Sequence, residues 1–207
     1  MKITQKPFYI LLSLFIMITF LAGCSLIPSA RKNQIAPAQL TSGQQDLINL
    51  LTAHHSEILL FDFATYDAFK NVEFWLELYE YGVMVERTQG IHMINPEPVP
   101  LDSQLAVIIN SEQGFRSFQW TFIVSDNGIW ASNRFESSPI ESDVMGRAFG
   151  PILEPIEIED GREIILYMSK FSRGGIRTFD DIQIFLDQPE LLADYPYSFM
   201  IKARFSK

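Results

Sequence analysis

Residues 117–136 have the sequence SFQWTFIVSDNGIWASNRFE, and the expected fold follows from their pattern. Apolar and polar residues alternate on both sides of Asp126-Asn127-Gly128, which is typical of strands with one buried face. Asn-Gly suits the two positive-φ positions of a type I′ turn, whose twist matches that of the flanking strands. The stretch therefore predicts an antiparallel β-hairpin with a two-residue loop.

A single register satisfies both strands of this hairpin, because it brings their apolar residues to one face. The expected cross-strand pairs are Val124 with Ala131, Phe122 with Asn133, and Trp120 with Phe135. In this register we expect Trp120 to point into the core.

The same two-residue period recurs along the chain. The further expected strands cover residues 58–63, 72–79 with a partner at 83–87, 105–109, 163–168 and 197–205. Turn residues such as Gly82 and Asp160-Gly161 separate them. Seven or more short strands predict a mainly β fold, an antiparallel β-sandwich of which the immunoglobulin-like architecture is one form.

One or two short helices are expected beside the sandwich. Residues 44–55 place their leucines and isoleucine on one side, with Thr41 or Ser42 as the N-cap, and so predict an amphipathic helix. Residues 187–192 begin with Asp-Gln-Pro and predict a short helical turn. Residues 179–186 fit a helix and a strand equally well.

The N-terminal segment has the layout of an export signal. Lys2 and Lys6 precede an apolar run of 14 residues, 8–21, broken only by Ser13 and Thr19. As a helix this run is about 21 Å long at about 1.5 Å per residue, too short for a hydrocarbon core of roughly 30 Å. We therefore expect the run to be part of a cleaved signal rather than a permanent span.

The run ends in Leu21-Ala22-Gly23-Cys24, which resembles the lipobox of bacterial lipoproteins. The resemblance implies cleavage before Cys24 and attachment of diacylglycerol to its sulfur. It also implies an extracytoplasmic protein, held on the outer leaflet of the cytoplasmic membrane or on the outer membrane. Cys24 is the only cysteine, so no internal disulfide can form. An ordinary secretory signal with a chance cysteine is the alternative.

Three regions follow from these patterns. Residues 1–23 are the expected signal peptide, residues 24–42 the lipidated cysteine and a flexible tether, and residues 43–207 a single β-rich domain. We expect residues 43–207 to fold without the tether, because residues 24–42 show neither apolar periodicity nor a strand pattern.

The expected mature chain is strongly acidic. After residue 23 it has 14 basic and 25 acidic residues, a net charge of −11 with neutral histidines. Such a chain is a poor nucleic-acid partner, because binding needs Lys and Arg to neutralise phosphates. We also expect anionic headgroups to repel the domain, so that the lipid on Cys24 alone provides the membrane attachment.

Motifs for catalysis, cofactors and metals are missing from the sequence. It contains no Gly-x-Ser-x-Gly elbow, His-Glu-x-x-His pair, phosphate-binding glycine loop or Cys-x-x-Cys pair. The adjacent pair His54 and His55 has poor geometry for sharing one metal on a helix, and His92 stands alone. The Asp180-Asp181 pair with Asp187 matches no calcium-loop spacing. We therefore expect neither a metal nor a cofactor.

One strand face offers candidate ligand-binding residues. Aromatic rings alternate there with carboxylates in the order Glu73, Trp75, Glu77, Tyr79 and Tyr81. If this face is exposed, its rings could stack on sugars while the acids bind hydroxyl groups. The alternative is that Trp75 and Tyr79 pack beneath the helix at 44–55 or beneath a second layer.

These observations favour a non-enzymatic envelope lipoprotein that binds a protein or glycan partner or assists an envelope assembly. One alternative is an envelope hydrolase that uses Glu73 and Glu77, whose Cα atoms lie about 6.5–7 Å apart on a strand. Such catalytic carboxylates should lie in a pocket and have a raised pKa. A second alternative is a small solute-binding lipoprotein, although those are usually two-lobed.

Overall fold

The computed structural model describes residues 32–52, 56–95, 100–112, 117–126, 128–140, 144, 146–175 and 181–207. The expected signal peptide with Cys24, the histidines at 54 and 55, Asn127 and Asp180 therefore lie outside the described residues. Lys32–Lys207 form one compact unit.

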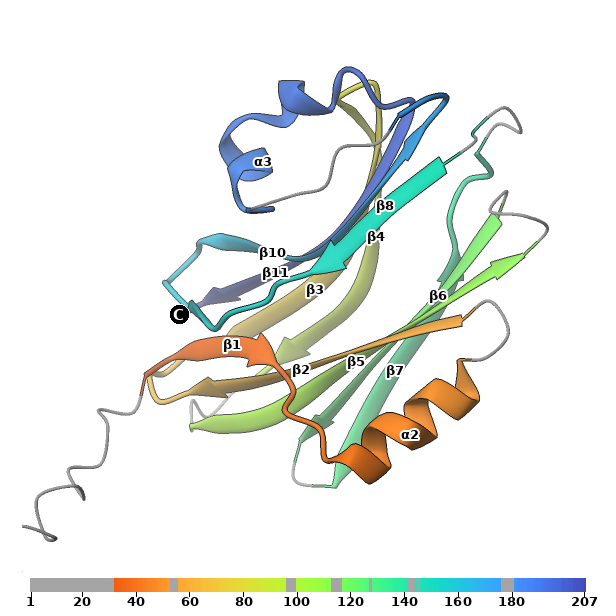
Figure 1. The fold of residues 1–207 in the computed structure, drawn as a ribbon. Helices are drawn as coiled ribbons and strands as arrows, with labels where there is room; N and C mark the ends of the chain where they lie inside the picture. Colours follow the sequence, from red (N-terminus) through yellow and green to blue (C-terminus); the bar gives the residue numbers. More distant parts are fainter. Residues whose placement is uncertain are drawn as a thin grey trace, which may run out of the picture. The chain divides into compact units, whose positions relative to one another are not determined.

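The described residues form two antiparallel β-sheets, confirming the predicted mainly β sandwich (Figure 1). The strand order in sheet A is β7 (Ile129–Glu136), β6 (Ser117–Asp126), β5 (Leu101–Glu112), β2 (Ser56–Thr65), β1 (Gln34–Pro37) and β9 (Ile156–Glu157). The strand order in sheet B is β4 (Val83–Ile94), β3 (Asn71–Glu80), β11 (Tyr197–Ser206), β10 (Glu163–Ser172) and β8 (Gly146–Pro151). This order differs from the ABED and CFG sheets of immunoglobulin constant domains.

The β6–β7 hairpin has the predicted register. Val124 pairs with Ala131, Phe122 with Asn133, and Trp120 with Phe135. Gly128 has a φ of 83°, as the expected turn requires. Trp120 is fully buried, and its ring centroid lies 5.3 Å from that of Phe199 on β11. The hairpin thus contributes directly to the contact between the sheets.

The remaining core is also largely aromatic. Phe63 of sheet A contacts Phe74 and Phe205 of sheet B at centroid distances of 5.6 and 5.7 Å. On β4, Gly90 lets the edges of the sheets approach, since a Cβ there would lie 2.8 Å from the Phe122 ring and from the Phe74 carbonyl oxygen. The inward residues of β11 are buried: Tyr197, Phe199, Ile201, Ala203 and Phe205.

The predicted tether at residues 24–42 is wrong in its last part. Residues 34–37 form β1, which pairs with β2 on one side and β9 on the other. Ile35 is fully buried between the sheets. A four-residue strand is too short to show a periodic pattern. Its position is determined by its pairing with β2 and β9. The folded domain therefore begins before residue 43, and its core includes Ile35.

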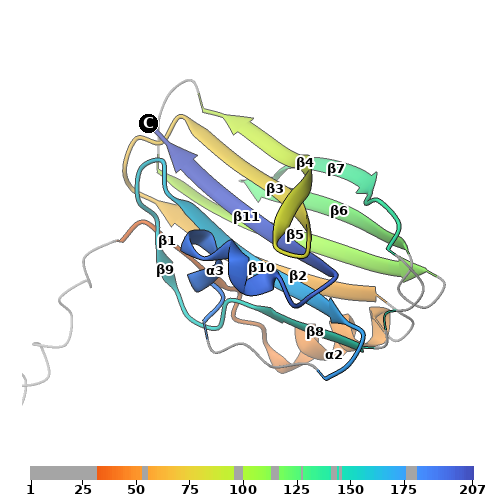
Figure 2. The ribbon, with the colours of Figure 1, turned by 90° about the horizontal axis from the view of Figure 1, so that it is seen from above.

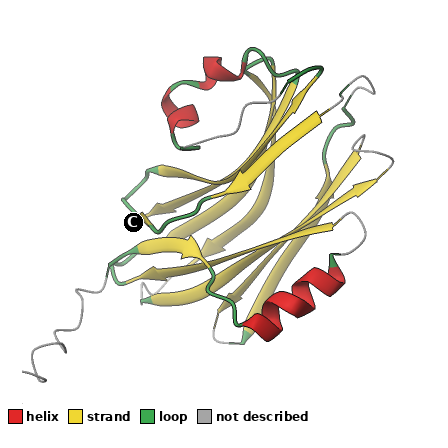
Figure 3. Ribbon diagram, viewed as in Figure 1, coloured by secondary structure: helices red, strands yellow, loops and turns green. Residues whose placement is uncertain are grey.

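The helices lie outside the sheets (Figure 3). Helix α2 (Ser42–Leu51) has Thr41 as N-cap in a capping box with Gln44, and it ends before the predicted residue 55. A short helix α3 (Ile184–Asp187) and a 3₁₀ turn η2 (Pro189–Leu192) follow β10. No helix among the described residues is long and apolar enough to cross a membrane.

Two turns have the predicted glycines but different roles. Tyr81 and Gly82, with φ angles of 47° and 81°, connect β3 to β4 as a hairpin. Gly161, with a φ of 73°, lies in a turn that leads from β9 of sheet A to β10 of sheet B. The Asp160-Gly161 turn therefore passes between the sheets and does not close a hairpin.

Candidate functional site

The predicted ligand-binding face does not form an open aromatic surface. The side of sheet B that faces away from sheet A carries Trp75, Glu77 and Tyr79, because these residues alternate with core residues along β3. Only 1%, 3% and 7% of their respective surfaces are exposed. Tyr81 is exposed, but it belongs to the turn rather than to the strand. The expectation that sugars stack on Trp75 and Tyr79 is therefore contradicted by their burial.

A polar network centred on Glu77 connects these side chains to β11. Lys202 Nζ lies 2.7 Å from Glu77 Oε2 and 3.2 Å from Glu163 Oε2. Trp75 Nε1 donates to Glu77 Oε1 at 2.8 Å, and the Tyr79 hydroxyl donates to Glu77 Oε2 at 2.7 Å. Glu77 is thus the centre of a buried, hydrogen-bonded ion pair.

Two arginines extend this network. Arg204 donates to Glu73 Oε2 through Nε at 3.0 Å and Nη2 at 2.5 Å. The Arg87 guanidinium lies 4.3 Å from the centre of the Trp75 ring, a cation–π distance. The arginine side chains therefore occupy positions that a sugar ring would need.

The electrostatics of Glu77 do not suit a general acid. Burial alone would raise its pKa, but hydrogen bonds from Lys202, Trp75 and Tyr79 lower the pKa further than burial raises it. The pKa of Glu77 is consequently below its ordinary value of 4.5, the opposite of the direction expected for the hydrolase. Burial raises the pKa of the Tyr79 hydroxyl, which remains a donor.

The described candidate metal ligands do not converge. His92 Nε2 lies 3.4 Å from Asn71 Oδ1. Asp181 Oδ1 accepts a hydrogen bond from the backbone N–H of Gln183 at 2.8 Å. In the described part of the chain, no group of three or more His, Cys, Asp or Glu side chains could hold a metal ion.

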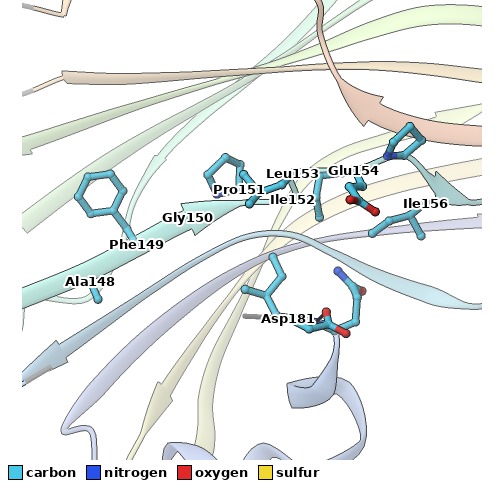
Figure 4. A pocket seen from close by; sticks show the side chains of 12 residues that line it. Ala148, Phe149, Gly150, Pro151, Ile152, Leu153, Glu154, Ile156 and Asp181 are labelled. Carbon is cyan, nitrogen blue, oxygen red and sulfur yellow. Dashed lines mark hydrogen bonds between the residues drawn. The ribbon is translucent and has the colours of Figure 1, made fainter. Parts of the chain in front are cut away.

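A groove beside β8 is the better candidate site (Figure 4). It has a volume of about 780 Å³ and lies where the chain leaves sheet B after Pro151. Phe149 and Leu153 line it with 55% and 84% of their surfaces exposed. Its two walls are formed by residues 148–156 and 181–183.

The far wall is fixed to β10 by one side chain. The side-chain nitrogen Nε2 of Gln183 donates to the backbone carbonyl of Ile165 at 2.6 Å. The side-chain oxygen Oε1 of Gln183 accepts from the backbone N–H of Ile165 at 3.0 Å. Gln183 thereby takes the place of a neighbouring strand where β10 extends beyond β8. On the near wall, the Ile152 amide donates to the Leu166 carbonyl at 2.9 Å.

Carboxylates surround the groove. Glu154 and Asp181 line it, and Glu163 and Asp187 line an adjoining hollow of about 530 Å³ that shares Asp181 with it. The one arginine lining this hollow, Arg162, is paired with Glu159 at 2.5 Å. The site therefore combines exposed apolar side chains with an excess of negative charge.

A buried arginine holds β8 against sheet A. Arg147 is paired with Glu57 of β2 and donates to the Tyr167 hydroxyl at 2.5 Å, while that hydroxyl donates to Glu57 at 2.8 Å. The Arg147 guanidinium also lies 4.7 Å from the centre of the Phe149 ring. The groove is thus built on an edge strand that is joined to sheet A by a buried ion pair.

Sequence reasoning missed this groove. Residues 148–156 show no strand alternation, and the other wall comes from residues about 30 positions later in the chain. The available signal was a cluster of apolar residues among three helix- and strand-breaking residues: Gly150, Pro151 and Pro155.

Comparison with protein families gives one clear relationship. The model of the YgaN domain family matches residues 34–201, from the first residue of β1 into β11. The match includes all of β1 and so supports its assignment to the domain. No curated protein and no solved structure matches the chain.

Proposed function

The chain belongs to the YgaN domain family, and we propose that it is a lipid-anchored envelope lipoprotein whose β-sandwich binds a partner protein in the groove beside β8. The observation that carries the binding proposal is this groove, with exposed Phe149 and Leu153 on a sheet edge. Exposed apolar side chains in a concave site are typical of a binding surface.

The anchor is inferred from the N-terminal sequence. Lys2, Lys6, the apolar run and Leu21-Ala22-Gly23-Cys24 together form a lipoprotein signal, and Cys24 would carry the lipid. Two acyl chains hold a protein far more firmly than one, at about 0.8 kcal/mol per buried methylene. An anchored domain then meets its partner at the surface of the bacterial membrane.

The chemistry of the groove favours an extended, basic and apolar peptide segment. β8 is an edge strand, and a sheet edge can accept a further strand from a partner. Phe149 and Leu153 can contact apolar side chains, while Glu154 and Asp181 can pair with lysine or arginine. A segment that alternates leucine with lysine has this complementarity.

The other expected functions have weaker support. The rings proposed to stack on glycans are buried, and Glu77 has a lowered pKa where a hydrolase would need a raised one. Lys32–Lys207 form a single compact unit rather than the two lobes of most solute-binding lipoproteins. A protein partner is therefore the proposal with the most direct structural support.

The anchor is tested by a Cys24→Ser variant expressed in bacteria with radioactive palmitate. We expect the wild-type chain to be labelled and the variant to remain unlabelled and unprocessed, because the variant lacks the sulfur that accepts diacylglycerol. Equal labelling of the two chains would disprove the lipoprotein proposal.

The groove is tested by fluorescence anisotropy with a synthetic peptide of alternating leucine and lysine, using the full chain in detergent. Leu153→Ser should weaken binding about tenfold, since burial of one leucine is worth roughly that factor. Leu50→Ser on α2 is the matched control, because Leu50 is also exposed but does not line the groove. Equal binding by wild type and Leu153→Ser would exclude the groove.

A further inference from the structure

The outer face of sheet A carries an apolar strip. Strand register places two rows of side chains across β2, β5, β6 and β7, on the face opposite the buried core. One row consists of Ile58, Ile108, Thr121 and Arg134, and the other of Leu60, Ala106, Ile123 and Ser132. The apolar members are all partly exposed, and we call these two rows the outer strip.

The two sheets differ in how their outer faces are covered. Ile182, Phe185 and Leu192, from the segment containing α3 and η2, are buried, and Figure 2 shows this segment over sheet B. Among the described residues, α2 is the only helix beside sheet A, and Figure 1 shows it on the side away from sheet B. The outer strip is therefore left without an equivalent layer.

Helix α2 adds exposed leucines to this side of the domain. Leu47, Leu50 and Leu51 are 55%, 74% and 63% exposed. Their spacing of three and four residues puts them on one face of the helix. α2 has no buried residue, so its leucine face is not used for packing within the domain.

The outer strip and α2 themselves carry little charge, and the carboxylates Asp62 and Glu136 lie in the rows that flank the strip on the same face. Residues 32–207 contain 13 basic and 25 acidic residues, a net charge of −12. The outer strip contains one charged residue, Arg134, and α2 contains one, Asp46. A nearly neutral, apolar face on an acidic protein is the part that an anionic bilayer repels least.

We infer that the outer strip and the leucine face of α2 rest on the lipid surface of the membrane that carries the anchor. This inference depends on the proposed lipid on Cys24. Only nine residues separate Cys24 from Gln34, which allows a reach of at most roughly 35 Å. The chain enters the domain at β1, a strand of sheet A, so the anchor keeps this sheet close to the bilayer.

A second copy of the chain is a less suitable occupant. Two domains with charges of −12 repel each other, whereas lipid contact requires no shape complementarity. Trp130 supports the lipid surface as well, because it is 70% exposed at the β7 edge of sheet A, and tryptophan favours the membrane interface. The acidic charge thus repels headgroups without preventing contact through this particular face.

Trp130 also provides the test. The other tryptophans, Trp75 and Trp120, are 1% and 0% exposed, so lipid-borne quenchers can reach only Trp130. The lipidated full chain is reconstituted into vesicles of phosphatidylcholine and phosphatidylglycerol with brominated acyl chains. We expect the bromines to quench the wild-type emission and to leave that of Trp130→Phe unchanged.

Matched variants separate docking from anchoring. Leu50→Asp should lower the ratio of docked to undocked protein about tenfold and so restore emission, because burial of one leucine is worth roughly that factor. Leu153→Asp introduces the same charge at the groove leucine, which is 84% exposed, and should have no such effect. Protein that floats with the vesicles but shows no quenching would overturn the docking alone. Protein that carries no lipid and does not float would overturn both the anchor and the docking.

Discussion

Glu77 illustrates, at the scale of single residues, how a buried charge is tolerated in this fold. Its two oxygens accept hydrogen bonds from Trp75 and Tyr79, and Lys202 supplies the opposite charge at 2.7 Å. A buried charge is expensive unless it is both paired and hydrogen-bonded. The group therefore depends on all of its members, so removing a single partner should be more harmful than replacing the ion pair as a whole.

Lys202→Met tests this dependence by removing the positive partner of Glu77. The substitution should destabilise the domain by about 3–5 kcal/mol, because it leaves a buried carboxylate without its cation. In the double variant Lys202→Met with Glu77→Gln, part of that loss should be recovered. Urea unfolding measures both free energies, and a double variant less stable than Lys202→Met alone would contradict the argument.

The lowered pKa of Glu77 gives a second prediction. Above about pH 4.5 the carboxylate is ionised in both the folded and unfolded states, so its stabilisation is fully present. As the pH falls through the folded pKa, which lies below 4.5, that stabilisation is lost. The difference in unfolding free energy between wild type and Glu77→Gln should therefore shrink between pH 5 and pH 2. A difference that grows as the pH falls would contradict the direction of the shift.

At the scale of elements, the hairpin around Asn127-Gly128 was predictable because its information is local. Turn type, loop length and alternation all lie within residues 117–136, and each one indicates the same register. Strand β1 was not predictable in this way, because four residues carry too little periodicity. Its place is set by pairing with residues 61–64 and 156–157, which are distant in sequence.

Gly128→Val tests the turn. A Cβ at Gly128 would meet no atom within 4 Å, so any loss of stability comes from the φ of 83° rather than from a clash. We expect a cost of about 1–3 kcal/mol in thermal or urea unfolding. Gly150→Val is the control, since Gly150 is equally open but has no positive φ. Equal effects of the two substitutions would refute the turn argument.

Ile35→Ala tests whether β1 is part of the folded domain. Ile35 is fully buried, so the truncation should cost about 2–5 kcal/mol, whereas Gln34→Ala, at an exposed position, should change little. A chain that starts at Gly43 should for the same reason be less stable than one that starts at Lys32. Equal stability of those two chains would show that β1 does not contribute to the folded domain.

The candidate sites were less predictable than the strands. Alternation correctly placed Trp75, Glu77 and Tyr79 on one face. Their charged partners, Lys202, Arg204 and Arg87, come from the neighbouring strands β11 and β4. The groove depends on the approach of residues 181–183 to the end of β8, a contact with no local sequence signal. Alternation in the sequence predicts the face of the sheet on which a side chain lies. It does not predict which residues from other segments contact that side chain, and a binding site depends on those contacts.

At the scale of the whole molecule, charge links stability to binding. A net charge of −12 over residues 32–207 makes the folded domain repel itself, and salt screens this repulsion as the Debye length falls from about 30 Å at 0.01 M to about 8 Å at 0.15 M. Salt also weakens exposed ion pairs such as Arg162 with Glu159, but such pairs contribute only about 0–1 kcal/mol each. The buried pair of Lys202 with Glu77 is screened much less.

Screening of the repulsion should therefore prevail, and added salt should stabilise the domain by roughly 0.5–1 kcal/mol over this range in urea unfolding. Neutralising one exposed carboxylate in the groove and one in the adjoining hollow, with Glu154→Gln and Asp187→Asn, should reduce this gain, because part of the repulsion originates there. A domain that salt destabilises would mean that ion pairs outweigh the repulsion. If the expected result holds, a basic peptide in the groove relieves the same repulsion that salt screens, so its binding should be tightest at low salt.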